Sequence, residues 1–544
     1  MSKKKIYFYG FNRPVKFTGD KNAPGVMFYN TVPIILDAFV RRTDPELHAQ
    51  IEWAELAIFE KSTPELIQEL NDLDIDMLCV SLYVWNVKII LDSIKNIKQH
   101  LNKKIKIIAG GPSVDIYRNR NFLLDNPDID YAIYTQGEHA FLNVLESVVR
   151  GKKLNTLNTK NLAWVDDNKQ VKISNFEFVK NTEGSPYLES QDLLLRMKNE
   201  TNSKGYDLTL PYETSRGCPH KCSFCDWTSG LTHKVSKREF DYEEELDFLG
   251  RNGIINLQMS DANFGILKRD LDIAKTLVRL KAEKGYQYKI WGNNFNKSKK
   301  DIVFEIIDLL LGSGILIAPK IAVQDVNPDV LKNIDRPDIP WKEHRVYIEK
   351  MKEKYPDVDM RVELILGLPG QTCESWENTL IETYPFTPWV YPLSIIPNSP
   401  MGYDLEYREK MKFKTLWSNM DSLNESYNIE IVIETYSYTF DDYTYNMLLA
   451  KLLNRVELRE IKDRREFFNR VKISSGLADI KAKIKAHVEN STIENIKFDI
   501  SKFILSLYKD FTDWPEEIDK KLKEFIRNDY YNQKRNIQTQ RHIG

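Results

Sequence analysis

The feature that most constrains the fold is an alternation of short apolar runs with amphipathic stretches, which occurs in two separate series along the chain. In the first series, "DMLCVSLYVW" predicts a buried strand and "VKIILDSIKNIKQHL" a helix with apolar residues at helical spacing. "KIKIIAGGPS" and "DYAIYTQGEHAFLNVLESVV" predict two further strands that end near glycines. Strands that alternate with helices predict a parallel sheet with right-handed crossovers. We therefore predict a Rossmann-like α/β domain over residues 1–165.

The second series covers residues 206–410 and predicts more strands with helices between them. The predicted strands are "DLTLPYETS", "IINLQMSD", "YKIWGNN", "IAPKIAVQ", "MRVELILG" and "VYPLSIIP". The stretch from Leu267 to Gly285 predicts a helix that stops at its glycine. This order predicts a partial (β/α)6 barrel of the TIM type, in which functional groups lie at the carboxyl ends of the strands.

The regions that flank the second series have a different character. A chain of 544 residues is too long for one hydrophobic core and should divide into several domains. Residues 166–205 are polar and mixed, so we predict a linker there. After residue 410 the sequence becomes charged and helix-periodic, as in "YTYNMLLAKLLNRVELREIKDRREFFNRV". We predict a helical C-terminal domain over residues 411–544.

Composition excludes several classes of partner. Lys and Arg number 77 and Asp and Glu number 79, which gives a net charge of -2. This balance predicts no nucleic acid partner and no anionic membrane surface. The N-terminus has no apolar run of the kind found in signal peptides, and the most apolar later stretch is interrupted by Glu305 and Asp308. We therefore predict a cytoplasmic protein without a membrane span.

Three of the five cysteines lie within eight positions of the chain. Cys218, Cys222 and Cys225 follow the strand "DLTLPYETS", so we expect them in the loop at its carboxyl end. Closely spaced thiolates hold iron–sulfur clusters. Three ligands leave one iron open, and an open coordination position is what a metal needs to bind a substrate.

Two other interpretations of this loop stay open. A zinc site could combine the three cysteines with His220 or His233, or the cysteines could serve only the structure of the loop. No second cysteine pair supports a zinc knuckle, because Cys79 and Cys373 are isolated and are expected to be packed thiols.

The cysteine stretch resembles a known family signature. "Cys218-Pro-His-Lys-Cys222-Ser-Phe224-Cys225" is similar to the C-x-x-x-C-x-aromatic-C signature of radical S-adenosylmethionine (SAM) enzymes. The resemblance implies that the three cysteines hold a [4Fe-4S] cluster with Phe224 beside it. It also implies that the fourth iron binds the amino and carboxylate groups of SAM, and that an electron then cleaves SAM to a 5′-deoxyadenosyl radical.

Other segments match the same family in order from residue 208 to about residue 400. Ser260 and Asp261 follow the second predicted strand, where the family places polar groups for the methionine part of SAM. Gln324 lies in a segment similar to the family's fourth strand. Glu363 and Gly367 lie in "ELILGLPG", which resembles the fifth-strand turn that contacts the adenine, and "IPNSP" resembles the ending of the sixth strand. The resemblance implies that these residues bind SAM.

Residues 70–150 resemble the cobalamin-binding domain that precedes the radical domain in cobalamin-dependent radical SAM enzymes. A Rossmann-like sheet with glycines at its strand ends suits a cofactor with a nucleotide tail. The residues for which the resemblance implies cobalamin contacts are Ser81, Gly110, Gly111, Gln136, Gly137 and Glu138.

This stretch also departs from many cobalamin proteins. It has no Asp-x-His-x-x-Gly motif, so a protein histidine on the cobalt is not expected. The alternative is an empty domain in which the glycines serve only as turns.

These features predict an enzyme that cleaves SAM reductively and methylates an unactivated carbon, in the manner of the class B radical SAM methyltransferases. A cyclase or rearrangement enzyme with the same cofactors is the first alternative, and a non-catalytic metal or cobalamin sensor is the second. A methylthiotransferase would need an additional N-terminal cluster, for which Cys79 is the one cysteine present there. The expected partners are a small-molecule or peptide substrate and an electron donor such as flavodoxin or ferredoxin.

Overall fold

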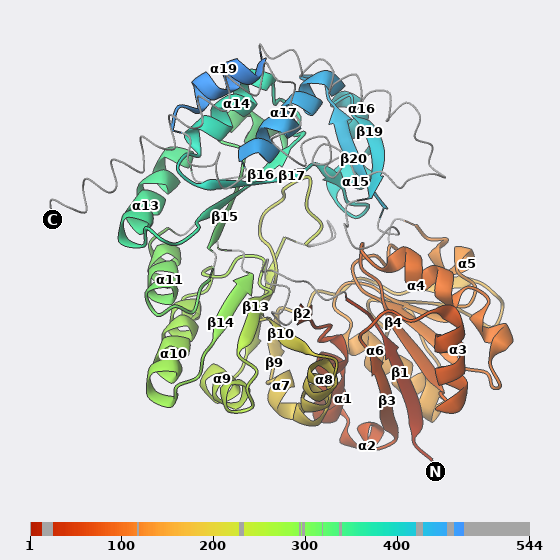
Figure 1. Cartoon of the computed structure of the whole chain (residues 1–544). Helices are drawn as coiled ribbons and strands as arrows, with labels where there is room; N and C mark the ends of the chain where they lie inside the picture. Colours follow the sequence, from red (N-terminus) through yellow and green to blue (C-terminus); the bar gives the residue numbers. More distant parts are fainter. Residues whose placement is uncertain are drawn as a thin grey trace. The chain divides into compact units, whose positions relative to one another are not determined.

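The computed structural model describes residues 2–12, 25–116, 119–227, 233–292, 295, 300–317, 319–336, 340–419, 428–453 and 462–472 (Figure 1). The chain divides into two compact units. The first unit contains Met1–Pro219 and Asp226–Ile317, and the second contains His220–Cys225 and Ala318–Gly544.

The first unit begins with a sheet in the strand order β3-β1-β4-β5-β6-β7-β8. Its strands are β1 (Lys4–Tyr9), β3 (Ile51–Ala57), β4 (Met77–Ser81), β5 (Lys106–Gly110), β6 (Tyr131–Ile133), β7 (Leu162–Val165) and β8 (Val171–Ile173). The strands from β3 to β6 in this order are parallel, and β7 and β8 are antiparallel additions. This arrangement is the Rossmann-like sheet that the sequence predicts.

Helices cover both faces of this sheet. They are α1 (Val32–Thr43), α2 (Pro45–His48), α3 (Thr63–Asp72), α4 (Val87–Ile94), α5 (Phe122–Asp125) and α6 (Glu138–Arg150). Leu66 of α3 and Ile90 of α4 join one apolar core with the strands. On the opposite face, Phe141 of α6 stacks on Trp53 of β3 with ring centroids 5.8 Å apart. Because both faces are buried, the strands are almost continuously apolar.

A second sheet of the first unit has the order β14-β13-β10-β2, and all of its strands are parallel. The strands are β2 (Gly25–Phe28), β10 (Tyr206–Tyr212), β13 (Asn256–Met259) and β14 (Lys289–Gly292), and the helices beside them are α9 (Tyr242–Arg251), α10 (Arg269–Lys284) and α11 (Lys300–Gly312). The first half of the predicted barrel is therefore present. The pairing of β2 with β10 was not predicted, because it joins segments that are far apart in the sequence.

The predicted linker, residues 166–205, contains regular structure. Besides β8 it includes β9 (Asn181–Glu183), α7 (Pro186–Glu189) and α8 (Gln191–Ser203). The sequence did not predict these elements: Leu193, Leu194 and Met197 form a buried face of α8, and the polar residues around them mask this pattern. The domain boundaries themselves stay a prediction.

The second unit has a parallel sheet with the order β15-β16-β17. Its strands are β15 (Lys320–Gln324), β16 (Arg361–Leu366) and β17 (Thr387–Pro392), which are accompanied by α12 (Pro328–Asn333), α13 (Trp341–Lys354) and α14 (Cys373–Glu382). These are the strands of the second half of the predicted barrel. Each lies next to its neighbour in sequence, as strands do in a barrel.

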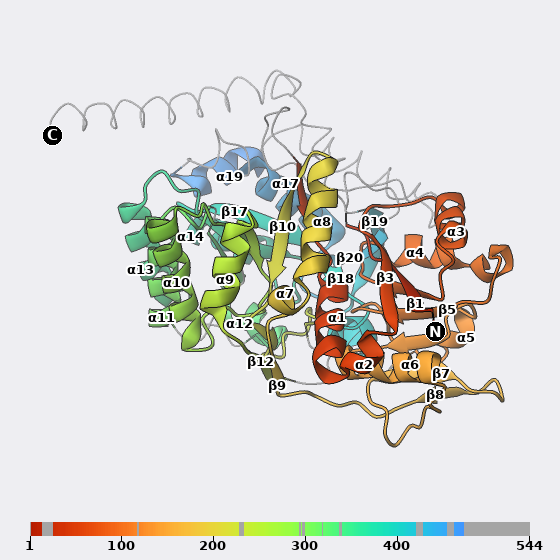
Figure 2. The ribbon, with the colours of Figure 1, turned by 90° about the horizontal axis from the view of Figure 1, so that it is seen from below.

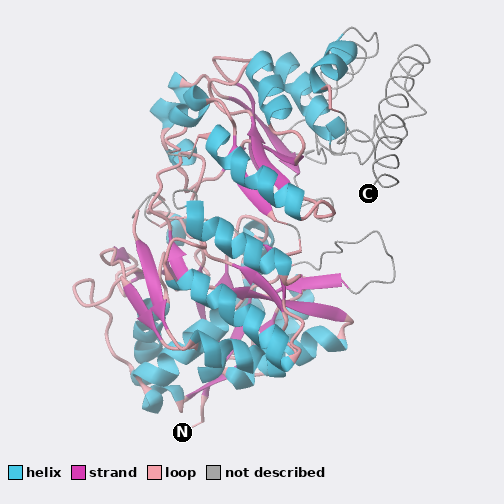
Figure 3. Ribbon diagram, turned by 90° about the vertical axis from the view of Figure 1, so that its left-hand side faces the viewer, coloured by secondary structure: helices cyan, strands magenta, loops and turns pink. Residues whose placement is uncertain are grey.

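The C-terminal part of the described chain is a mixture of strands and helices, which Figure 3 colours separately. Strands β18 (Ser394–Ile395), β19 (Lys414–Asn419) and β20 (Asn428–Glu434) form an antiparallel sheet, and the helices are α15 (Pro400–Tyr403), α16 (Leu405–Lys410), α17 (Phe440–Leu453) and α19 (Arg464–Lys472).

The expected helical character holds for α17 and α19 but was wrong for residues 414–419 and 428–434, which form β19 and β20. There the apolar run "IEIVIE" buries Ile431 and Val432 within a sheet. Residues 473–544 of the predicted helical domain lie outside the described part of the chain. Among the helices that are described, none is long and apolar enough to cross a membrane.

Candidate functional site

The loop that carries the cysteines begins and ends on an antiparallel pair of strands. It leaves β11 (Ser215–Gly217) and returns in β12 (Val235–Glu239), which pairs on its other side with β9 (Figure 2). Gly217 has a φ of +94°, and a Cβ at this position would lie 2.4 Å from the carbonyl oxygen of Lys234. Only glycine therefore lets the two ends of the loop pair, and Cys218 follows this glycine directly.

None of the three cysteines forms a disulfide bond in the described part of the chain. Cys218 falls in the first unit, and Cys222 and Cys225 fall in the second. Cys222 is buried, and the other two are partly exposed. Three cysteine side chains on one short loop match the chemistry of an iron–sulfur cluster, whose protein ligands are thiolates. Within the described residues, no group of three His, Cys, Asp or Glu side chains is gathered for a metal ion. The role of the three cysteines as cluster ligands therefore stays a prediction.

Cys218 has a hydrogen-bonding neighbour that sequence reasoning missed. The Nδ2 of Asn263 donates to the Sγ of Cys218 at 3.0 Å. Asn263 is 2% exposed and lies in the loop after β13. The available signal was its position two residues after Asp261, which the sequence did single out.

Asp261 supports the backbone that leads into the cysteine loop. Its buried carboxylate accepts hydrogen bonds from the hydroxyl of Thr214 at 2.9 Å and from the backbone N–H of Thr214 at 3.2 Å. It also accepts from the hydroxyl and the backbone N–H of Ser215. Burial raises the pKa of Asp261 to about 6. The structure thus gives Asp261 a supporting role, and its contact with SAM stays a prediction. Ser260 beside it is partly exposed and donates to the carbonyl of Gln258 at 3.3 Å.

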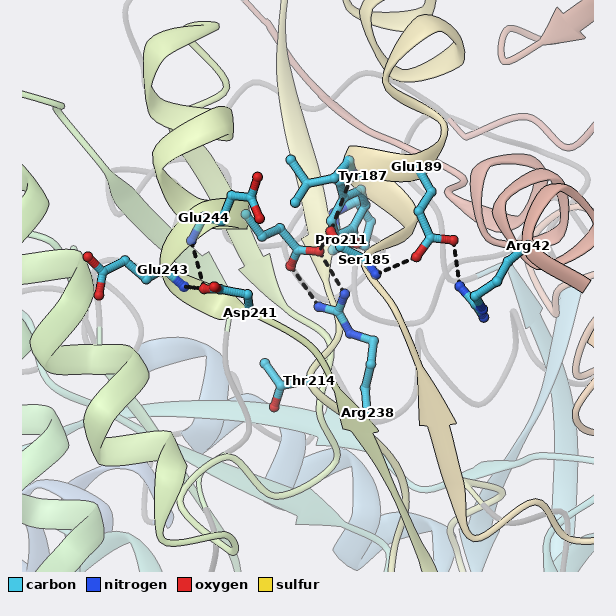
Figure 4. A network of polar contacts seen from close by, with 12 residues as sticks. Arg42, Ser185, Tyr187, Glu189, Pro211, Thr214, Arg238, Asp241, Glu243 and Glu244 are labelled. Atoms are coloured by element: carbon cyan, nitrogen blue, oxygen red, sulfur yellow. Dashed lines mark hydrogen bonds and ion pairs between the residues drawn. The ribbon is translucent and has the colours of Figure 1, made fainter.

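A buried ion pair fixes the strand at the other end of the cysteine loop (Figure 4). Arg238 of β12 binds Glu245 of α9 through two hydrogen bonds of 2.8 Å, and Ser185 donates to the same carboxylate. The guanidinium of Arg238 also lies 3.5 Å from the ring centroid of Phe240. Removing one partner of such a pair leaves an uncompensated buried charge, at a cost of about 3–5 kcal/mol. The strand β12, in which the cysteine loop ends, is therefore held firmly in place.

Arg216 connects β11 with the N-terminal sheet. Its guanidinium makes two hydrogen bonds to Glu213, at 2.9 and 2.8 Å, and a third to Glu138 at 2.8 Å. Burial raises the pKa of Glu138, but the charge of Arg216, its hydrogen bond to Glu138 and smaller contributions together lower the pKa further, and the net shift is downward. Glu138, which the resemblance assigned to cobalamin, is thus the ionised partner of an arginine two residues before Cys218. Its cobalamin contact stays a prediction.

The two adjacent glycines at the end of β5 differ in their surroundings. Gly111 has a φ of +104°, and a Cβ there would lie 2.5 Å from the carbonyl oxygen of Leu82. A Cβ on Gly110 would meet its nearest atoms, in Ile133, at 3.9 Å. Gly111 is therefore required by the packing of the chain itself, whereas Gly110 leaves space that a ligand can approach.

The remaining predicted cobalamin residues lie at the ends of neighbouring strands. Ser81 is the buried last residue of β4, and Gly137 caps the N-terminus of α6. The amide of Gln136 is occupied: its Nε2 donates to the carbonyl of Val179 at 3.1 Å, and its Oε1 accepts from the N–H of Val179 at 2.6 Å. For Gln136 the structure thus shows a bond to the protein's own backbone.

An aromatic pair lies beside this edge and was not assigned by sequence reasoning. Tyr83 and Trp85, just after β4, stack with ring centroids 4.6 Å apart. Trp85 is 40% exposed. An exposed tryptophan held by a neighbouring ring offers a flat apolar surface at the edge where Rossmann-like sheets bind ligands.

In the second unit, a relay of side chains shapes the Gly-Leu-Pro-Gly turn. The backbone N–H groups of Gly367 and Leu368 donate to the Oε1 of Gln371 at 2.8 and 3.0 Å. The Nε2 of Gln371 donates in turn to Asp325 at 2.6 Å. Burial raises the pKa of Asp325 to about 6. Gly367 has a φ of +108°, which favours glycine.

The other predicted SAM residues of the second unit have these contacts. Gln324 ends β15 with a φ of +70°. Glu363 forms an ion pair with Lys320 at 2.8 Å. Phe224 packs against an apolar cluster that includes Leu368. The ring of Phe224 therefore anchors the stretch between Cys222 and Cys225, and the contacts of these residues with SAM stay predictions.

Comparison with known proteins identifies the class of protein. Residues 212–381 match the model of the radical SAM superfamily. Residues 49–145 match the model of the B12 binding domain. The first match contains all three loop cysteines, and the second contains the carboxyl ends of β4, β5 and β6.

Two relatives are similar to this chain over longer stretches. The chain is 27% identical over 472 residues to 2-(S-pantetheinyl)-carbapenam-3-carboxylate methyltransferase of Streptantibioticus cattleyicolor, a match that covers 81% of this chain and 63% of that protein. It is 31% identical over 362 residues to the cobalamin-dependent radical SAM methyltransferase TokK of Streptomyces tokunonensis, a match that covers 62% of this chain and 50% of that protein. The chain thus spans about half to two thirds of the length of these relatives.

A solved structure shows the same fold. The methyltransferase TsrM of Kitasatospora setae, with cobalamin and a [4Fe-4S] cluster bound, superimposes with a TM-score of 0.58 at 13% identity, over 90% of this chain and 100% of that chain. The chain therefore carries a match to the radical SAM superfamily, preceded by a match to the B12-binding domain. The predicted family, the predicted fold class and the cofactor classes of that family are thereby confirmed.

Proposed function

We propose that this protein is a cobalamin-dependent radical SAM methyltransferase that acts on an unactivated carbon. The observation that carries the proposal is the loop with Cys218, Cys222 and Cys225, which follows the first strand of the radical SAM match. The B12-binding match ahead of it and the names of the relatives support methyl transfer as the outcome.

The residues divide into those that hold cofactors and those that shape their surroundings. In this proposal the three cysteines hold the [4Fe-4S] cluster, and the turn at Gly367 lies against SAM. Gly110 and the end of β4 at Ser81 border the cobalamin. When bound, these cofactors supply the electron, the hydrogen-atom abstraction and the methyl group.

The chain's own contribution is orientation. Asp261 holds the strand that enters the cysteine loop, and Arg238 holds the strand that leaves it. Gln371 fixes two backbone N–H groups of the glycine turn. These contacts keep the loops in place before any cofactor binds, which reduces the ordering that binding requires.

The substrate is proposed to be a small molecule. One relative is named for a carbapenam that bears a pantetheinyl group and a carboxylate, and 2-(S-pantetheinyl)-carbapenam-3-carboxylate is therefore the first compound to test. Trp389 and Tyr391, which stack at 6.0 Å on one face of β17, are candidates for substrate contacts. A cytoplasmic location and a flavodoxin or ferredoxin as electron donor complete the proposal.

The proposal is tested with anaerobically reconstituted protein, SAM and dithionite. We expect cobalamin in the purified protein, and 5′-deoxyadenosine above the level of a Cys218→Ala control. With a true substrate, S-adenosylhomocysteine should form in step with product, and a methyl group labelled with deuterium in SAM should appear in the product.

The other outcomes separate the alternatives. Product that forms with 5′-deoxyadenosine but without S-adenosylhomocysteine would favour a cyclase or rearrangement. No 5′-deoxyadenosine above the Cys218→Ala level would favour a sensor and contradict the proposal.

A further inference from the structure

We propose that Asn263 tunes the reduction potential of the cluster by donating a hydrogen bond to the sulfur of Cys218. The contact is direct, because Asn263 Nδ2 lies 3.0 Å from Cys218 Sγ. Hydrogen bonds to cluster sulfurs are one of the means by which a protein sets the potential of an iron–sulfur centre. The proposal rests on the proposed function, since it requires the cluster to be present.

The surroundings of Asn263 make the contact a fixed one. Its loop is tied at one end by Asp261, which accepts hydrogen bonds from Thr214 and Ser215. At the other end Asp270 accepts from the backbone N–H groups of Gly265 at 2.7 Å and Leu267 at 3.0 Å. Buried carboxylates therefore hold the chain on both sides of Asn263, which fixes the position from which its side chain reaches Cys218.

Electrostatics decides which end of the amide faces the sulfur. A thiolate is an anionic acceptor, so an N–H facing it is attractive, whereas the Oδ1 would place two acceptors together. Asn263 is 2% exposed, so water competes little for its donor. Its Oδ1 is buried and has no hydrogen-bond partner among the described residues, which leaves the sulfur as the one contact that its side chain makes there.

The direction of the effect follows from charge. Reduction of the cluster adds one electron, and the added negative charge spreads onto the sulfurs. A donor aimed at one of them stabilises the reduced form more than the oxidised form. Asn263 should therefore raise the potential, which makes the cluster easier to reduce by a weak cellular donor.

The experiment is a redox titration of the [4Fe-4S] signal, followed by EPR, in anaerobically reconstituted full-length protein. Asn263→Leu removes the donor and keeps the branched shape of the side chain, and we expect the reduction potential of its cluster to be more negative than that of the parent. The matched control is Asn252→Leu, because the amide of Asn252 bonds to the carbonyl of Phe248 within its own helix. Its potential should equal that of the parent.

A second variant tests the same inference if Asn263→Leu does not assemble a cluster. Asn263→Asp keeps the shape of the side chain but offers only acceptors to the sulfur, and its potential should fall at least as far. A cluster whose potential is the same in the parent and in either Asn263 variant would overturn this inference alone. A parent protein that assembles no cluster would overturn the proposed function, and this inference with it.

Discussion

Two edges of the first unit make different use of the polar residues that the sequence singled out. The first edge is formed by the carboxyl ends of β4, β5 and β6 in the N-terminal sheet, and we call it the N-terminal edge. There Gln136 is hydrogen-bonded to Val179, and Glu138 is hydrogen-bonded to Arg216. At the carboxyl ends of β10 and β13, here the cysteine edge, Asp261 is bonded within the protein, but Cys218 carries a thiol that is available for a metal.

The difference teaches how a cofactor can be held at each edge. At the N-terminal edge, most of the side chains for which the family resemblance implied cobalamin contacts form hydrogen bonds within the protein instead. Binding there must come from backbone, from open space as at Gly110, and from exposed rings such as Trp85. At the cysteine edge the ligands are side chains, and the structure around them serves to hold them in place.

The largest effect is expected from the cysteine edge. Alanine at Cys218, Cys222 or Cys225 should abolish 5′-deoxyadenosine formation and the cluster absorbance, because each would remove one of three protein ligands. Cys373→Ala is the control and should retain both. A Cys373 variant without a cluster, or an active variant at any of the three positions, would contradict the assignment.

At the N-terminal edge, alanine substitutions at the neighbouring residues Gly110 and Gly111 should have different effects. Gly111→Ala should lower the free energy of unfolding by about 3 kcal/mol or more, because a strained φ and an overpacked contact each cost roughly 1–3 kcal/mol. Gly110→Ala should leave stability nearly unchanged but weaken cobalamin binding. Thermal unfolding and the cobalamin absorbance of purified protein measure the two effects.

This pair of variants sharpens the comparison because it separates packing from ligand binding at adjacent positions. Equal stability losses in both variants would show that Gly110 is also a packing residue. Unchanged cobalamin content in Gly110→Ala would show that the ligand does not approach this part of the edge.

The buried carboxylate of the cysteine edge should make stability depend on pH. Burial raises the pKa of Asp261 to about 6, so the folded state binds this proton more tightly than the unfolded state. Protonation of Asp261 therefore contributes to the free energy of unfolding, fully below about pH 4 and less and less as the pH rises through about 6. At 1.36 kcal/mol per pKa unit, this contribution amounts to about 3 kcal/mol.

Urea unfolding between pH 4 and pH 7 measures this contribution. Asp261→Asn should lack this part of the pH slope, so the difference in stability between the parent and the variant should change across the range. Parallel curves for the two proteins would refute the raised pKa.

The smallest effect is expected where the two edges are connected. A double-mutant cycle with Arg216→Gln and Glu138→Gln should give a coupling of about 1 kcal/mol, because the guanidinium is partly exposed and solvent screens the pair. Arg150→Gln, which breaks the surface pair with Asp44, is the control and should leave the free energy of unfolding nearly unchanged.

An activity readout distinguishes positioning from general stability. If Arg216 aligns the cysteine loop with the N-terminal edge, Arg216→Gln should form more 5′-deoxyadenosine per methylated product than the parent. An unchanged ratio with less folded protein would show that the residue is only structural.

Much of the fold was predictable because its strands are short, apolar and bounded by glycines. Each strand of the Rossmann-like sheet that the sequence identified lies where its apolar run places it, and so do the first five predicted barrel strands. The sixth run, "VYPLSIIP", begins within β17 and continues into β18, which belongs to another sheet. The structure of α8 was missed because its three buried side chains are separated by polar residues. Residues 414–419 and 428–434 were misjudged because their charged positions obscured a period of two.

The site was predictable where its chemistry is local and not where it is long-range. The cysteine spacing lies within eight residues and is visible in the sequence. The contact between Asn263 and Cys218 joins positions 45 residues apart, and the contact between Arg216 and Glu138 joins positions 78 apart, so no local pattern reveals them. Gly110 and Gly111 are identical in the sequence, and only the structure around them shows which glycine is required for packing.

The pairing of β2 with β10 has a consequence for the order in which the molecule is assembled. The chain places β1 in one sheet and β2 in another, and then returns to the first sheet with β3. During synthesis, β2 must wait for Tyr206–Tyr212 to emerge from the ribosome before it gains its partner. The two sheets are therefore interlaced rather than arranged one after the other, and cutting the chain between them would leave β10 with an unpaired edge open to aggregation.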